Sequence, residues 1–217
     1  MKEHKVKILK IEQITPSVKS FMVERPKSYS FISGSHTHIT FDDGIKKDKH
    51  PFTICSLAKD DYLEFIIKEY PGGITEELHK LKEGDEIIIE KPAPQFKYKG
   101  KGVFIAAGTG VTPFICMLRD LRDRKEIEGN RLILSNKKAE DVILRKELKN
   151  MLDDDLILTF TKQKVRGCPY GRIDAEFLKE KIKDFDQYFY ICGPKIFVLQ
   201  VKKMLLGLGT DAERIIS

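Results

Sequence analysis

The sequence contains few cysteines, places none of them close together, and has no long apolar run. Cys55, Cys116, Cys168 and Cys192 lie at least 24 residues apart, so they offer neither a zinc site nor the cluster that an iron–sulfur centre needs. No run of about 18 apolar residues occurs, and the first residues alternate charged and apolar side chains, unlike a signal peptide. We therefore expect a cytoplasmic protein without a membrane span or a bound metal. Any redox chemistry would have to come from an organic cofactor.

The charge of the chain is unevenly distributed. Its 217 residues carry a formal net charge of +6. Residues 1–97 hold 16 basic and 16 acidic residues, whereas 98–217 holds 23 basic and 17 acidic residues. This excess fits a solvated basic surface, or a surface that attracts a phosphorylated cofactor or an acidic protein partner. Nucleic acid is disfavoured, because the basic residues are scattered among acidic ones and aromatic residues do not alternate with them.

The first half of the sequence has the pattern of a small antiparallel barrel. Short β-type runs, separated by turn-forming residues, cover 5–14, 18–24, 36–43, 50–58, 62–70 and 85–91. A helix is predicted over 75–81. Short strands with frequent turns are typical of antiparallel barrels, and the length of the chain accommodates two domains of about 100 residues each.

The second half has a longer period, typical of a doubly wound parallel sheet. Apolar runs over 102–107, 131–135, 155–160, 188–192 and 214–216 have the pattern of buried parallel strands, and helical periodicity covers 111–124, 139–152, 174–182 and 194–206. This alternation predicts an α/β domain with helices on both faces of the sheet. The polar stretch 97–101 marks the boundary, which divides the chain into domains 1–97 and 98–217.

A glycine-rich turn follows the first predicted parallel strand. Gly108, Thr109 and Gly110 precede Thr112 and Pro113, and a helix follows. Glycines permit a tight turn, Thr112 can cap the helix, Pro113 suits its first position, and the free N–H groups of a helix start bind anions. The pattern lacks the third glycine of the dinucleotide fingerprint. An ordinary strand-to-helix loop can also contain glycine and proline.

Two further turns have a similar composition. Cys192, Gly193 and Pro194 end another predicted parallel strand, so this turn and the first one lie at the carboxyl edge of one sheet, where such folds bind ligands. In the first half, glycines at 72 and 73 precede Thr75, which can cap the helix over 75–81 and form another anion site. A plain glycine turn before a capped helix would have the same pattern.

Four motifs in fixed order, HPFT, PGGIT, AAGTGVTPF and YICGP, resemble those of the ferredoxin–NADP reductase-like flavoproteins. The resemblance covers nearly the whole chain, and the segment FISGSHTHITF is similar as well, with Ser35 where the family commonly has Gln. The motifs are weak one by one and specific in combination. The resemblance implies a flavin-binding β-barrel over 1–97 and a domain over 98–217 that binds a nicotinamide dinucleotide.

For the flavin, the resemblance implies that Phe52 lies against the isoalloxazine ring and that the Thr53 hydroxyl contacts its N5 edge. His50 stands where the family has a phosphate-binding arginine, and an imidazole is only partly charged at neutral pH. Phosphate binding then depends more on the helix start or on Lys49, and FMN stays open beside the favoured FAD. The predicted flavin-binding residues are His50, Pro51, Phe52, Thr53, Ile66, Lys68, Gly72, Gly73, Ile74 and Thr75.

For the dinucleotide, the resemblance implies a pyrophosphate loop and a segment that borders the nicotinamide. The pyrophosphate loop consists of Gly108, Thr109, Gly110, Thr112 and Pro113. The bordering segment consists of Cys192, Gly193 and Pro194. Hydride transfer of this kind depends on holding two rings in contact and excluding water. Thr53 and Cys192 are therefore the residues predicted at the place where hydride passes.

The end of the second parallel strand bears on the choice between NADP and NAD. An NAD site commonly has an acidic residue there for the ribose hydroxyl, whereas this chain has Ser135, Asn136, Lys137 and Lys138. These side chains suit a 2′-phosphate, so NADP is favoured over NAD. A charged helix start is the alternative, since acidic residues follow at 140 and 141.

The function predicted from these features is an FAD-containing NADPH oxidoreductase that passes electrons to flavodoxin or ferredoxin, carriers whose acidity would suit the basic second half. The reductase component of a multi-protein oxygenase is the alternative within the same chemistry. A flavin-binding regulatory or assembly subunit without turnover, and a nucleotide-binding barrel protein without flavin, are alternatives of other classes. Many members of the family that the chain resembles have an acidic and an aromatic residue after the last strand, and in some the aromatic covers the flavin. GTDAERIIS has no aromatic, so hydride exchange is expected to be less gated, or a neighbouring subunit to supply the cover.

Overall fold

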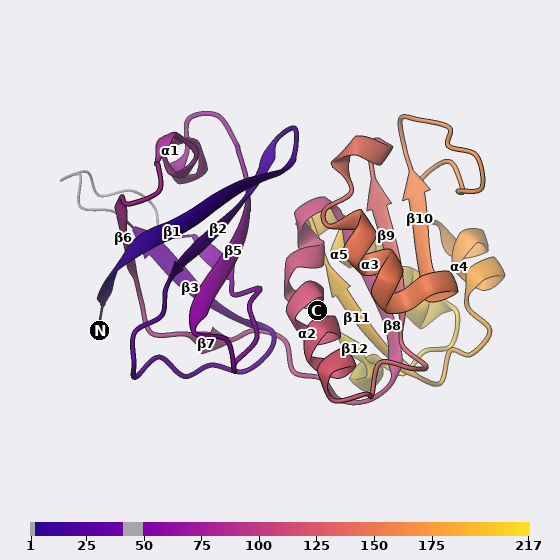
Figure 1. Ribbon diagram of the computed structural model, residues 1–217. Coiled ribbons are helices and arrows are strands. Elements are labelled where there is room, and N and C mark those ends of the chain that lie inside the picture. The colour runs from indigo at the N-terminus through magenta and orange to yellow at the C-terminus, as the bar shows by residue number, and fades with distance from the viewer. Residues whose placement is uncertain (1–2, 41–49) are drawn as a thin grey trace.

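The computed structural model describes residues 3–40 and 50–217, and these form two sheets that lie side by side (Figure 1). The first sheet follows the order β4-β3-β6-β1-β2-β5, with β7 paired to β3, and all its pairs are antiparallel. A short helix, α1 (Ile74–Lys80), lies beside it. Its strands are β1 (His4–Thr15), β2 (Val18–Glu24), β3 (Ser35–Thr40), β4 (Pro51–Thr53), β5 (Tyr62–Lys68), β6 (Glu86–Ile89) and β7 (Ala93–Pro94).

The second sheet is parallel throughout and has the order β10-β9-β8-β11-β12. Its strands are β8 (Gly102–Ala107), β9 (Arg131–Asn136), β10 (Leu156–Phe160), β11 (Tyr188–Cys192) and β12 (Ile215–Ile216). Its helices are α2 (Thr112–Asp123), α3 (Arg145–Leu152), α4 (Ala175–Lys181) and α5 (Lys195–Gly207). One apolar core joins the sheet to α2 and α3, and a second joins its other face to α4 and α5. The predicted barrel followed by a doubly wound sheet is confirmed.

Two predicted elements are shorter than expected. The helix over 139–152 is interrupted: a 3-10 turn covers Ala139–Asp141, the backbone of Leu144 is left-handed with φ 49°, and α3 begins only at Arg145. Val142 and Ile143, in the irregular segment between the 3-10 turn and α3, are buried in the core. The strand over 50–58 ends at Thr53. The N–H of Ile54 still donates to Ser35 of β3 (3.0 Å), whereas the N–H of Cys55 donates to Glu64 of β5 (2.7 Å), so the chain turns from β3 toward β5 at this point.

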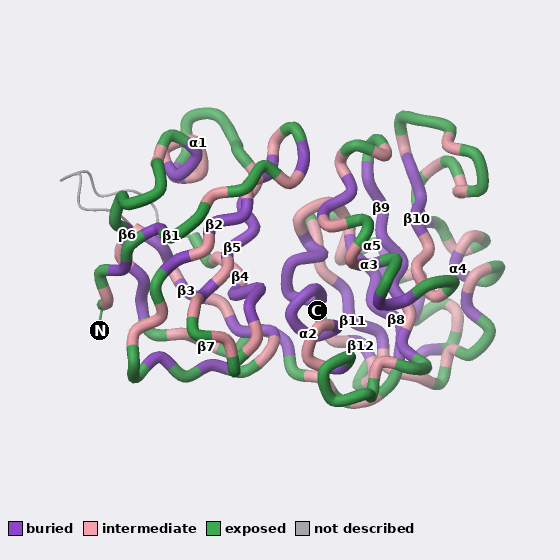
Figure 2. Tube along the Cα trace, viewed as in Figure 1, coloured by how far each residue is buried: buried purple, intermediate pink, exposed green. Residues whose placement is uncertain are grey.

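The core beneath α2 is shared by the two sheets. Val18, Cys55, Ile66 and Phe96 from the first half pack in the same cluster as residues of β8, β9 and α2. Most of α2 is buried as a result, and Figure 2 shows this helix between the two sheets. The barrel is therefore held against the α/β part through apolar contacts and not only through the connecting chain.

The connection between the sheets runs from β7, which ends at Pro94, to β8, which begins at Gly102. The division into domains 1–97 and 98–217 stays a prediction. Among the residues that the structure describes, no helix is both long enough and apolar enough to cross a membrane.

Candidate active site

A pocket of about 930 Å³ lies where the two sheets meet. Its barrel side comes from β4, the end of β5 and the start of α1, and its other side comes from the carboxyl ends of β8, β9 and β11. This is the edge at which doubly wound sheets bind ligands, and the volume lies in the range of small-molecule and cofactor sites.

The predicted site residues converge on this pocket, except for Gly72 and Lys138. The residues that line it include His50, Pro51, Phe52, Thr53, Ile66, Lys68, Gly73, Ile74, Thr75, Gly108, Thr109, Gly110, Thr112, Pro113, Ser135, Asn136, Lys137, Cys192, Gly193 and Pro194. Gly72 is outside the lining, and its N–H donates to the carboxylate of Glu76 at 2.6 Å. That bond and the ammonium of Lys80 lower the pKa of Glu76. Lys49 lies outside the described residues, and the role of each lining residue toward a cofactor stays a prediction.

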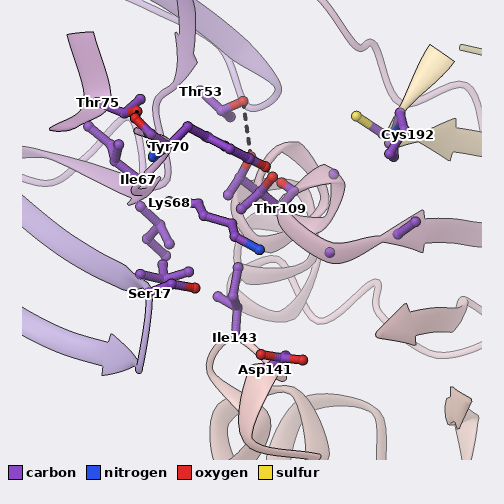
Figure 3. A pocket seen from close by; sticks show the side chains of 18 of the residues that line it. Ser17, Thr53, Ile67, Lys68, Tyr70, Thr75, Thr109, Asp141, Ile143 and Cys192 are labelled. Carbon is purple, nitrogen blue, oxygen red and sulfur yellow. Dashed lines mark hydrogen bonds between the residues drawn. The ribbon is translucent and has the colours of Figure 1, made fainter. Parts of the chain in front are cut away.

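Two threonine side chains from the two halves of the chain are in contact at the wall of the pocket. The hydroxyl oxygens of Thr53 on β4 and Thr112 on α2 lie 3.3 Å apart, as the dashed line in Figure 3 shows. Thr112 also lies 3.0 Å from the carbonyl oxygen of Thr109 and donates to it. The contact fixes the hydroxyl of Thr53 at the junction of the barrel and the α/β part.

Thr112 and Thr75 do not cap their helices, contrary to the sequence prediction. Thr112 is the first residue of α2, preceded by the 3-10 turn Gly108–Val111, so Pro113 occupies the second helical position. The residue before α1 is Gly73, and the hydroxyl of Thr75 instead accepts the N–H of Tyr70 at 3.0 Å. Both predictions failed for the same reason: each helix begins at or before its threonine, so the N-cap positions are taken by Val111 and Gly73.

Two glycines give the first turn its shape. A Cβ on Gly110 would lie 2.4 Å from the carbonyl oxygen of Cys192, so only glycine allows the turn to pack against the end of β11. Gly108 has φ +55°, and a Cβ there would meet nothing within 4 Å. The backbone at Gly108 is thus left open on the pocket side, as close approach to a ligand requires.

Asn136 has buried polar atoms without a partner. Its side chain is 5% exposed and lines the pocket, and neither its carboxamide nitrogen nor its oxygen has a hydrogen-bond partner among the described residues. Leaving such a group unpaired costs about 1–3 kcal/mol. A polar ligand in the pocket, such as a ribose or an amide, would satisfy it. A dinucleotide therefore fits the residues that are present.

The charged residues beside Asn136 are not equivalent. Lys137 lines the pocket, and its carbonyl is held by the N–H of Lys162 at 2.9 Å. Lys138 forms an ion pair with Glu140 at 3.1 Å, and its N–H donates to Asp141 at 2.9 Å. Asp141 also lines the pocket. Of the two lysines, Lys137 is therefore the one that an anionic ligand in the pocket would meet, whereas the ammonium of Lys138 is already paired with Glu140.

Cys192 is a neutral thiol at physiological pH. Burial raises the pKa of its side chain from 9.0 to about 11. A thiolate is the reactive form of cysteine, so the raised pKa disfavours a role for Cys192 as a nucleophile or a base.

Arg119 on α2 joins three segments that approach the pocket. Its guanidinium donates to Glu64 on β5, to the carbonyl of Cys55 at 2.8 Å, and to both carboxylate oxygens of Glu147 on α3 at 2.6 and 2.9 Å. These ion pairs raise the pKa of Arg119 against the opposing effect of burial. The bidentate pair with Glu147 and the half-buried location make Arg119 a polar clamp between the two sheets.

Several residues that line the pocket could not be predicted from the sequence. Tyr70 is 54% exposed, and the Lys68 ammonium lies 5.7 Å from the centre of its ring. Figure 3 shows both side chains extending into the pocket from the barrel side, opposite Ile143 and Asp141. The turn between β1 and β2 reaches the pocket because Val18 pairs with Lys68. Ile67, between the predicted Ile66 and Lys68, lines the pocket as expected for the strand that resembles the family's flavin-binding strand. The missed residues are Thr15, Ser17, Val18, Tyr70, Gln95, Ala107, Asp141, Ile143 and Thr161.

The two halves match two family models. Residues 3–86 match an FAD-binding domain, and residues 104–203 match an oxidoreductase NAD-binding domain. Together with the barrel, the parallel sheet and the pocket between them, these matches define the class: an oxidoreductase that binds FAD and a nicotinamide dinucleotide. The chain belongs to the ferredoxin–NADP reductase-like flavoprotein family.

Relatives of the chain differ in their electron acceptors. It is 28% identical to NADH-cytochrome b5 reductase 2 of Meyerozyma guilliermondii, over 66% of this chain and 54% of the relative. It is 26% identical to the glycine betaine monooxygenase reductase subunit of Pseudomonas aeruginosa, over 97% of this chain and 62% of the relative. A ferredoxin NADP+ reductase of Neisseria gonorrhoeae, solved with FAD and NADP, has the same fold, with a TM-score of 0.87, 22% identity, and coverage of 99% and 97%. The chain spans about half the length of the first curated relatives it matches.

Proposed function

We propose that this protein oxidises NADPH in the pocket between its two sheets and passes the electrons, through bound FAD, to a small carrier protein such as flavodoxin or ferredoxin. The observation that carries the proposal is the convergence of Thr53, from the barrel, with Gly108 and Cys192, from the α/β sheet, on one pocket. A reaction between two cofactors needs such a junction, because each half supplies the binding surface for one of them.

Bound FAD would accept a hydride from the nicotinamide and release its two electrons singly. The chain's own contribution is to position the reactants. We assign Phe52 and Thr53 to the flavin ring, the Gly108–Val111 turn to the pyrophosphate of the dinucleotide, and Asn136 and Lys137 to its adenosine end. Closing the space between the sheets would keep water from the reacting rings.

The preference for NADPH over NADH rests on Lys137. Lys137 lines the pocket, whereas Lys138 pairs with Glu140, and the ammonium of Lys137 can neutralise a 2′-phosphate. Because Asp141 lines the same region, we expect a modest preference for NADPH and measurable activity with NADH. The four cysteines are free thiols, as is usual in a reducing compartment, which supports a cytoplasmic location.

A reductase component of a multi-protein oxygenase is the second candidate. The resemblance to the glycine betaine monooxygenase reductase subunit extends over 97% of this chain, and the site would be the same. The two candidates differ only in the protein that accepts the electrons. A subunit without turnover is disfavoured, because the loops at Gly108 and Cys192 are intact and open onto the pocket.

The visible spectrum of the purified protein tests the proposal. We expect a yellow protein whose flavin absorbance is bleached by anaerobic addition of NADPH, and more slowly by NADH. A colourless protein, or a yellow one that neither nucleotide reduces, would refute the proposal. Extraction of the pigment distinguishes FAD from FMN. It therefore also shows whether the chain binds FAD with His50 in place of the family's arginine.

A further inference from the structure

Helix α5 presents apolar side chains to solvent. Ile196 is 71% exposed, Leu199 58% and Leu206 43%. A surface helix normally turns its apolar stripe to the core and its polar residues to water. α5 does bury one side against the sheet, through Val201 and Leu205. Its outer side is nevertheless apolar as well, which is unusual for a surface that contacts only water.

The same outer side carries positive charge alone. α5 contains Lys195, Lys202 and Lys203 and no acidic residue, and no ion pair within the described ranges involves these lysines. Lysines of α1 and α3, by contrast, pair with carboxylates one turn away. At 3.6 residues per turn, the three lysines and the three exposed apolar residues fall within an arc of roughly 120°. We call these six residues the α5 patch.

The α5 patch begins at the wall of the pocket. The helix starts directly after Pro194, which lines the pocket together with Cys192 and Gly193. The first turn of α5 packs against this wall: a Cβ on Gly193 would lie 3.0 Å from the Phe197 ring. A protein seated on the patch would therefore stand beside the site of the proposed hydride transfer.

We propose that the α5 patch is the docking surface for the protein that receives electrons from this chain, and that this protein presents an apolar spot bordered by carboxylates. The inference rests on the proposed function and assigns a place to its partner. Opposite charges raise the rate of encounter and select the partner, whereas a few buried apolar side chains supply most of the affinity.

Two other occupants fit the α5 patch less well. A second copy of the chain, related by a two-fold axis, would place the lysines of one patch against those of the other. An anionic membrane would attract the lysines, but interfacial helices insert a broad apolar face. The broad apolar face of α5 is already buried against the sheet, which leaves three apolar side chains to insert.

The proposal is tested by two double variants, I196S/L199S and K202E/K203E, with Leu9→Ser and Lys27→Glu on the barrel as matched exposed controls. Each protein reduces a panel of acceptors with NADPH: an acidic flavodoxin, a [2Fe–2S] ferredoxin, cytochrome b5, and ferricyanide as a small acceptor. We expect both α5 variants to raise the KM for at least one carrier protein about tenfold or more. Ferricyanide reduction stays at the wild-type rate, and the controls behave as wild type.

Other outcomes overturn the docking surface in distinguishable ways. Two results would contradict the docking role of the α5 patch without contradicting NADPH oxidation. One is reduction of ferricyanide but of none of the three carriers, and the other is equal carrier kinetics in all variants. A wild-type dimer in light scattering that the α5 variants dissociate would assign the patch to a second copy. Binding of the wild type, but not of the variants, to phosphatidylserine vesicles would assign it to a membrane. A protein that cannot reduce ferricyanide would contradict the proposed function itself.

Discussion

The hydroxyl oxygens of Thr53 and Thr112 lie 3.3 Å apart and join strand β4 to the first turn of helix α2. Thr53 is the residue predicted at the reactive edge of the flavin, and Thr112 begins the helix that follows the predicted pyrophosphate loop. This contact thus helps to fix the position of the barrel relative to the α/β part at the place where the two cofactors would meet.

Thr53→Ala should slow flavin reduction by NADPH about tenfold or more, the effect of losing one positioned hydrogen bond in a transition state. The KM for the nucleotide should change little, because Thr53 belongs to the barrel side. Stopped-flow traces separate the two quantities. Thr53→Ser, which keeps the hydroxyl, is the matched control, and weaker nucleotide binding with an unchanged reduction rate would remove Thr53 from the site.

Lys137→Ala should raise the KM for NADPH about five- to tenfold, as expected for one exposed charge contact of about 1 kcal/mol, and should spare NADH. Lys138→Ala serves as the control, since its ammonium already pairs with Glu140, and it should change neither constant appreciably. Steady-state kinetics with both nucleotides decide the matter. Equal effects of Lys137→Ala on NADPH and NADH would refute the 2′-phosphate assignment.

Gly110→Ala should impair folding or abolish flavin reduction, because the new methyl group would lie 2.4 Å from the carbonyl oxygen of Cys192. Overpacking of this kind costs about 1–3 kcal/mol. Gly108→Ala meets open space, so its stability cost should be about 1 kcal/mol from the left-handed backbone, and its main effect should be a raised KM for the dinucleotide. Urea unfolding and steady-state kinetics test the pair. Similar behaviour of the two variants would contradict the different roles of these glycines.

Arg119→Ala should lower the free energy of unfolding by about 2 kcal/mol, less than for a fully buried pair, since it leaves the half-buried carboxylates of Glu64 and Glu147 without their partner. Hydride transfer should also slow, because the clamp links β5, whose end lines the pocket, to α3, which begins shortly after the lining residue Ile143. Arg124→Ala is the control: its side chain is 44% exposed, and surface pairs contribute about 0–1 kcal/mol. Equal destabilisation by the two substitutions would show that the clamp has no special role.

The stability of the protein should fall at alkaline pH. Burial raises the pKa of Cys116 and Cys192 from 9.0 to about 11, so the folded state holds these two protons more tightly than the unfolded state. Their stabilising contribution is complete below pH 9 and is lost as the pH rises from 9 to 11, by about 2–3 kcal/mol per thiol at most. Urea unfolding at several pH values measures the slope. The double variant C116A/C192A should lose less stability over this range, and an unchanged slope would contradict the assignment.

The elements that the sequence predicts best are those with a clear local period. Alternating apolar runs identified the strands, and the order of the glycine motifs identified which loops share a pocket. The predictions that failed concern which of several possible hydrogen-bond or ion-pair partners a side chain selects. Local pattern cannot show that Thr75 bonds to the backbone of Tyr70, or that Arg119 contacts carboxylates on β5 and α3. Tyr70 and the β1–β2 turn reach the pocket only through strand pairing, which no single segment encodes.

Apolar residues of the barrel and of the α/β part pack in a single cluster around α2. Separating the two sheets would expose apolar surface on both sides and leave the clamp of Arg119 broken. We therefore expect the shared cluster to couple the melting of the two halves, although the barrel also has a separate apolar core of its own. Exchange of one half between relatives would succeed only where the residues facing α2 are exchanged with it.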